Sequence, residues 1–163
     1  MKNTVSSKLL NGFVVVGIIL TILVLVGTPL GLTAVFKVSN IKVVNENMPW
    51  ILTMFIYICA VPYVLALFKL KSICGLLGDE NPFSLKISEE FKVIAICAFS
   101  EVILFIVSQL ILCFVYDFYL YVLTILPIII VSFISIIAGF LSIVMSNIFK
   151  KAAEIKEELD LTF

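Results

Sequence analysis

The sequence contains no histidine and no arginine, because all 11 of its basic residues are lysines. Without histidine the chain lacks the most common general base and neutral metal ligand of proteins. Without arginine it lacks the planar group that binds phosphate or carboxylate through paired hydrogen bonds. It also has no glycine-rich phosphate loop and no pair of acidic residues within the apolar segments. We therefore predict that it is not an enzyme, and we expect no catalytic residue, no metal site and no cofactor.

Charged residues are also scarce, at 13% of the chain, and 11 acidic residues balance the lysines. The balance gives no sign of a nucleic-acid partner, and we expect no direct binding to nucleic acid. Hydrophobic residues make up 63%, well above the roughly 45–50% of soluble domains, so the excess must face something other than water. The cysteines form no CxxC motif and are expected to be reduced thiols that pack as small hydrophobic groups. They are Cys59, Cys74, Cys97 and Cys113.

Four apolar segments are long enough to cross a bilayer, at about 9–36, 51–68, 93–116 and 119–149. The first has no charge over 28 residues, whereas about 20 are enough to span the hydrocarbon core. Pro29, between Gly27 and Gly31, is expected to kink or end this helix. A cleaved signal peptide is the alternative, but the segment is too long and lacks a convincing small-residue cleavage site. The sequence thus predicts an all-α integral membrane four-helix bundle in one domain, 1–163.

The connections between these segments are polar. Pro49 and Trp50 suit a helix start at the membrane interface. The longest connection, 69–92, is predicted to hold a short amphipathic helix ending at Gly78. Either Asn81 with Pro82, or Ser84 alone, would cap the next helix. A short turn around Asp117 separates the last two spans, and the fourth helix is expected to continue beyond Phe149 to about Leu159.

The lysines predict the orientation. If the N-terminus is cytoplasmic, only Lys37 and Lys42 lie outside. The other nine then lie on the cytoplasmic side, at positions 2, 8, 69, 71, 86, 92, 150, 151 and 156. Lysine is enriched in cytoplasmic segments of membrane proteins, so we predict that both ends of the chain, the 69–92 loop and the 150–163 tail are cytoplasmic.

Glu101 is the one ionisable residue deep within a predicted span. A carboxylate near the bilayer midplane costs on the order of 3 kcal/mol, and no span supplies a basic partner. Its side chain should therefore face the bundle interior, be protonated, or contact a cavity. Ser108 shares its helix face and Gln109 lies nearby. A proton-coupled transport site is one interpretation, and a protonated carboxyl hydrogen-bonded to a neighbouring helix is the other.

The fourth span carries a stripe of small residues with spacings of 3, 4, 3 and 4. Small side chains let helices approach closely in lipid. The stripe predicts packing within the bundle, with a homo-oligomer seam as the alternative; a shorter pair, Gly27 and Gly31, lies on the first span. The stripe consists of Ser132, Ser135, Gly139, Ser142 and Ser146.

The predicted cytoplasmic tail is a charged helix with an apolar seam. Ile148, Ala152, Ile155 and Leu159 recur at helical spacing. The seam could pack on the 69–92 loop of the same chain or bind an external partner, since both surfaces are expected on one side of the membrane.

Two segments resemble motifs of a family of small bacterial membrane proteins catalogued as a domain of unknown function. They are Gly78–Ser84, before the third span, and Ala152–Phe163, after the fourth; Leu159 stands where Asn or Gln is more usual, and Phe163 where Ile or Val is. Members of the family are often encoded beside a helix-turn-helix regulator of the Cro type. The resemblance implies a four-span protein of the bacterial cytoplasmic membrane that tethers or modulates such a regulator.

The leading hypothesis from the sequence is a non-enzymatic membrane protein whose cytoplasmic loop and tail bind a soluble helix-turn-helix regulator. A small proton-coupled transporter that uses Glu101 is one alternative. An immunity protein that meets a membrane-active peptide through residues 37–47 is another. The predicted docking residues are Asn81, Pro82, Phe83, Ile155, Leu159, Asp160 and Leu161.

Overall fold

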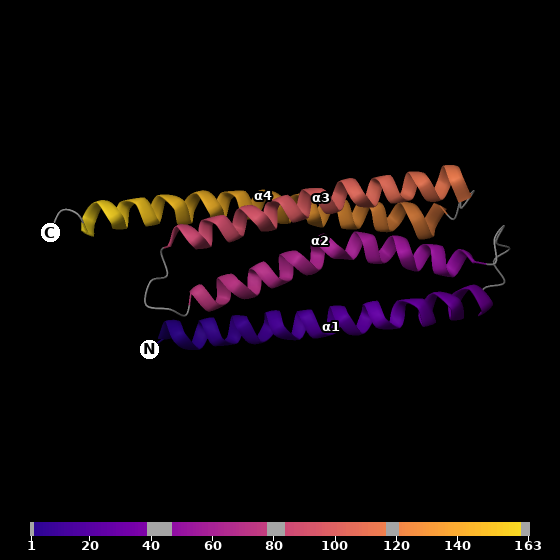
Figure 1. Ribbon diagram of the computed structural model, residues 1–163, viewed down its shortest axis with the longest axis horizontal. Coiled ribbons are helices and arrows are strands. Elements are labelled where there is room, and N and C mark those ends of the chain that lie inside the picture. The colour runs from indigo at the N-terminus through magenta and orange to yellow at the C-terminus, as the bar shows by residue number, and fades with distance from the viewer. Residues whose placement is uncertain (1, 39–46, 78–83, 117–120, 161–163) are drawn as a thin grey trace.

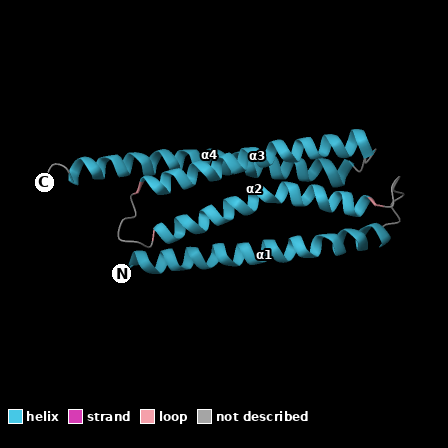
Figure 2. Ribbon diagram, viewed as in Figure 1, coloured by secondary structure: helices cyan, strands magenta, loops and turns pink. Residues whose placement is uncertain are grey.

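The computed structural model describes residues 2–38, 47–77, 84–116 and 121–160, with side chains for 9–38, 47–77, 84–116 and 126–159. These residues form four helices, named in chain order in Figure 1. Figure 2 shows helix as the regular structure throughout the described residues, which confirms the all-α class. The helices are α1 (Lys2–Val38), α2 (Met48–Leu76), α3 (Leu85–Tyr116) and α4 (Tyr121–Asp160).

Each helix contains a segment long and apolar enough to cross a membrane. These segments have 29 to 34 residues and a mean hydropathy of 2.3 to 2.8. Their large apolar side chains mostly point away from the other helices; Phe13 is 73% exposed and Phe133 is 65% exposed. Such outer faces would be strongly unfavourable in water, but they match the hydrocarbon of a bilayer. The predicted membrane four-helix bundle is therefore confirmed.

The helices run up and down, and each packs on the next in sequence: α1 on α2, α2 on α3 and α3 on α4 (Figure 1). The start of α1 and the end of α4 lie at the same end of the bundle, called here the terminal end; the other is the distal end. Val14, Ile18 and Cys74 form a buried cluster toward the terminal end. A second cluster, built around Met48 and Leu112, packs the distal end. The middle of the bundle lies between these two clusters.

Helix α1 continues through Pro29 to Val38, whereas the sequence left open whether the helix would end near this proline. Proline lacks the N–H that would bond the carbonyl four residues earlier, which is that of Leu25. The Tyr57 hydroxyl of α2 donates a hydrogen bond to this carbonyl at 3.0 Å. A backbone group freed by proline must find a partner inside a bilayer, and α2 supplies it.

Tyr57→Phe is therefore expected to destabilise the protein by about 1 kcal/mol, the typical net value of one hydrogen bond. Pro29→Ala restores a backbone N–H that can bond Leu25, so Tyr57→Phe should have little effect in that background. Unfolding by dodecyl sulfate in mixed micelles would be compared for the wild type, the two single variants and the double variant. The four values give the energetic coupling between Tyr57 and Pro29. Equal effects of Tyr57→Phe in both backgrounds would contradict this account.

The polar connections contribute more helix than the hydropathy suggests. Helix α2 runs without a break past Phe68 to Leu76, in place of the separate short helix expected after Lys69. Lysine ends an apolar segment but not a helix, because it is a good helix former. At the other end of α2, Pro49 lies in the first turn, as predicted. Helix α3 starts directly after Ser84, although the Ser84 hydroxyl finds no hydrogen-bond partner among the described residues.

Candidate functional site

The small-residue stripe of α4 lies against α3. Ser135, Gly139, Ser142 and Ser146 are buried, and Ser132 is partly buried. A Cβ on Gly139 would lie 2.9 Å from Cζ of Phe99, so the phenyl ring of α3 occupies the space where a side chain would begin. The Gly27 and Gly31 positions of α1, by contrast, face open space. The structure thus places the α4 stripe within the bundle and the α1 pair on its outer surface.

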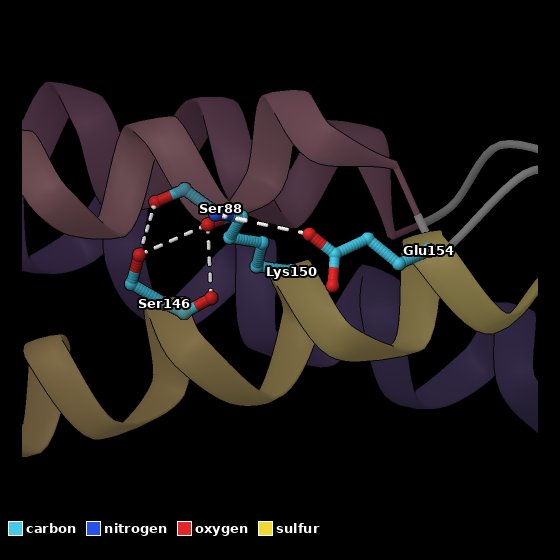
Figure 3. A network of polar contacts seen from close by, with 4 residues as sticks. All are labelled: Ser88, Ser146, Lys150 and Glu154. Carbon is cyan, nitrogen blue, oxygen red and sulfur yellow. Dashed lines mark hydrogen bonds and ion pairs between the residues drawn. The ribbon is translucent and has the colours of Figure 1, made fainter.

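Two buried serines join α3 and α4 near the terminal end (Figure 3). Each hydroxyl donates to the main-chain carbonyl of the other residue, Ser88 to Ser146 at 2.9 Å and Ser146 to Ser88 at 2.8 Å. Next to them, the Phe91 and Phe149 rings stack with their centroids 5.6 Å apart. One turn beyond Phe149, Ala153 is also buried, with an exposed fraction of only 8%. These contacts fix α4 rigidly against the first turns of α3.

An ion pair joins α2 to α3 at the same end. Lys69 Nζ lies 2.9 Å from Glu90 Oε2, and Ser72 donates to Glu90 Oε1 at 3.2 Å. The Glu90 side chain is 11% exposed, whereas that of Lys69 is 39% exposed. A carboxylate so deeply covered requires a cation and donors. Residues in the predicted polar loop therefore hold two helices together.

Polar side chains also meet in the middle of the bundle. Glu101 lies near the centre of α3 and accepts a hydrogen bond from Ser135 of α4, at 3.2 Å. On the same face of α3, the Ser108 hydroxyl lies 3.4 Å from Cys59 Sγ of α2. One residue further, the Gln109 side-chain oxygen is buried and has no hydrogen-bond partner in the described part of the chain. The structure thus places the three predicted intramembrane polar residues along the interior of the bundle.

Two adjoining cavities occupy this level. The first, of about 370 Å³, is lined by all four helices, including Thr21, Glu101 and Val131. The second, of about 310 Å³, reaches toward the distal end and is lined by Ser108 and Gln109. Both have Ile56, Cys59, Phe105 and Val131 in their walls. They exist because α1 packs only on α2. Its backbone does not come close to the described parts of α3 and α4, and the space between these helices stays open.

The last turns of α4 form a separate exposed surface. Figure 1 shows the C-terminal end of α4 extending beyond the start of α3. Ile148, Ile155 and Leu159 are 54%, 58% and 56% exposed, on the side of the helix opposite the buried Ala153. The sequence-predicted seam thus lies away from α3. Of the other predicted docking residues, Asn81, Pro82, Phe83 and Leu161 and the side chain of Asp160 lie outside the described residues, as do positions 39–46.

Several residues that shape these sites were not predicted from the sequence: Tyr57, Ser88, Phe99 and the Lys69–Glu90 pair. A signal existed for the first, because a proline within a span frees a carbonyl that a neighbouring hydroxyl can satisfy. The others have no local signal, since a serine or phenylalanine is common in any membrane helix.

Fold and sites together define a multi-pass α-helical membrane protein with a few polar side chains in its interior and a projecting terminal helix. Residues 34–163 match a family described as protein of unknown function, DUF2975, and the chain belongs to this family. Comparison with curated proteins finds no match. Comparison with solved structures finds none either.

Proposed function

We propose that this protein holds a soluble regulator at the membrane through the exposed end of α4. The observation that carries the proposal is the exposed apolar face formed by Ile148, Ile155 and Leu159, hereafter the tail face. Ile148 continues the outer face of the span, whereas Ile155 and Leu159 lie beyond Lys150 and Lys151, where a span would end. Apolar side chains on a projecting charged helix suit insertion into the groove of a partner.

The charges around the tail face favour a basic partner. From Lys150 to Asp160 the sequence has four acidic residues and three lysines, a net charge of −1, with three of the acidic residues at positions 157, 158 and 160. Helix-turn-helix regulators carry basic surfaces for DNA, and opposite potentials steer association and fix its specificity. The nine-to-two distribution of lysines supports placing this end of the bundle in the cytoplasm, where such a regulator would be met. The resemblance of Gly78–Ser84 and Ala152–Phe163 to the family motifs implies the same class of partner.

Leu159→Asp tests the proposal, because it adds a charge to the tail face at the last residue of the apolar segment of α4, beyond Lys150 and Lys151. Full burial of a leucine contributes about 1.5–3 kcal/mol, so we expect partner affinity to fall by about tenfold to a hundredfold. The measurement is the membrane-bound fraction of the candidate helix-turn-helix regulator, from immunoblots of fractionated cells. The regulator should move to the soluble fraction while the membrane protein itself stays inserted.

Glu157→Gln is the matched control, since Glu157 is exposed on the opposite side of the same helix and the substitution also alters one charge. It should leave the regulator in the membrane fraction. Retention of the regulator by Leu159→Asp, at the wild-type level, would refute the proposal. So would photocrosslinks from position 152 that reach only residues 69–77 of the same chain.

A further inference from the structure

The middle of the bundle has the features of a ligand site. Apolar clusters close both ends, around Val14 and Ile18 on one side and around Met48 and Leu112 on the other. The two cavities lie between these clusters and have volumes of about 370 and 310 Å³. Small-molecule sites usually have volumes of roughly 300–1,000 Å³. Their walls are apolar except for a few polar groups, which is the usual composition of such sites.

The acidic group in these cavities is the Glu101 carboxyl, and it has no cationic partner among the described residues. Glu101 lines the first cavity and accepts one hydrogen bond, from the neutral Ser135 hydroxyl. Among the described residues, Lys69 pairs with Glu90 and Lys150 pairs with Glu154. No lysine occurs within the apolar core of any span, so this protein does not itself supply a cation at that depth. A ligand with a protonated amine would provide both the charge and the hydrogen-bond donors.

A second unsatisfied group lies further along the same helix. The buried Gln109 side-chain oxygen lacks a donor in the described part of the chain, and Gln109 lines the second cavity. Buried acceptors in native proteins nearly always have a partner. Gln109 follows Glu101 by eight residues, or about 12 Å of helix. One elongated ligand can therefore reach both groups while its apolar body contacts Phe105, which lines both cavities.

The first cavity has an entrance from the lipid. Val24 and Tyr63 line it on α1 and α2 and are 60% and 43% exposed, so the described helices do not cover the cavity at these residues. A ligand that dissolves in the bilayer can thus enter between the helices without crossing the polar ends. This route favours an amphiphile over a strongly hydrated ion.

We propose that these two cavities form an intramembrane binding site for hydrophobic amines, with Glu101 binding the ammonium group and Gln109 accepting a hydrogen bond from a second donor. The site is independent of the tail face, and binding does not require transport.

The test uses purified full-length protein in nanodiscs of phosphatidylcholine, a lipid with no net charge. The probe is dansylcadaverine, which carries a primary amine, a pentyl chain and a fluorescent sulfonamide with an N–H donor. The alcohol of the same skeleton is the uncharged control, and empty nanodiscs give the background. Wild-type protein should bind the amine at least about tenfold more tightly than the alcohol, as expected from one hydrogen bond between charged groups.

Glu101→Gln keeps the size of the side chain and can still accept from Ser135, but it removes the charge. It should lower amine affinity to that of the alcohol and leave alcohol binding unchanged. Val131→Phe fills both cavities and should weaken both probes, which keeps the test decisive even where Glu101→Gln does not fold. Equal binding of amine and alcohol to the wild type would overturn the proposal, as would an amine preference that survives Glu101→Gln. Binding of both probes unaltered by Val131→Phe would overturn the location.

Discussion

Gly139→Leu is expected to destabilise the protein by about 3 kcal/mol, at the upper end of what overpacking costs. The Phe99 ring lies directly against the first side-chain atom, with its Cζ 2.9 Å from the ideal Cβ position, closer than van der Waals contact. It also makes an edge-to-face contact with Phe140 at 5.5 Å between centroids, so the ring cannot move without losing this second contact. The larger side chain must therefore push α3 away from α4 along the stripe. A dodecyl sulfate titration in mixed micelles would report the lower unfolding midpoint.

Gly27→Leu is the matched control, because a side chain at Gly27 meets no atom within 4 Å and points outward. Leucine also has a better helix propensity than glycine, so the unfolding midpoint should stay the same or rise slightly. Similar losses from the two substitutions would show that the effect belongs to glycine in general and not to the α3–α4 contact.

Lys69→Met is the second substitution with a large expected effect. It leaves the Glu90 carboxylate, 11% exposed, without its cation at 2.9 Å. Breaking a fully buried pair costs about 3–5 kcal/mol; because Lys69 is 39% exposed and partly screened by water, we expect about 2 kcal/mol. The same micelle titration gives this difference.

The double substitution Lys69→Met with Glu90→Leu separates charge from packing. Replacing both partners by apolar groups of similar size is often neutral, so the double variant should recover most of the stability that Lys69→Met loses. Ser72, which donates to Glu90, is partly exposed and can turn to water. A double variant less stable than the single one would mean that Glu90 acts through contacts other than the ion pair.

These substitutions act at two of the three interfaces between consecutive helices, and the Tyr57 substitution acts at the third. Gly139 lies between α3 and α4, Lys69 between α2 and α3, and Tyr57 between α1 and α2. In a bilayer, lipid is as apolar as leucine, so helices associate through close packing and hydrogen bonds and not through the hydrophobic effect. Each interface of this bundle uses one or both of these interactions at a small number of residues.

The sequence by itself determined the four spans, since a bilayer of fixed thickness requires apolar segments of a fixed minimum length. It also predicted that Ser132 to Ser146 share one face of a helix and that Glu101 lies near the middle of its span, because both follow from helical geometry within one segment. The family resemblance arose from short motifs in the chain in the same way. Helix ends were less well predicted. Helix α2 continues past Lys69, because a polar residue can end an apolar segment without ending a helix. Helix α1 continues past Pro29, and the Tyr57 hydroxyl bonds the Leu25 carbonyl that the proline leaves free.

Only the tertiary structure decided which faces meet. It set the stripe of α4 against Phe99, joined Ser88 to Ser146, and turned Ile155 and Leu159 away from α3. It also left Glu101 and Gln109 beside cavities, because α1 packs on α2 alone and leaves the middle of the bundle open. The physical reason is that periodicity fixes the positions of side chains around one helix axis. Contacts between helices depend in addition on rotation, tilt and distance, which residues far apart in the sequence determine together.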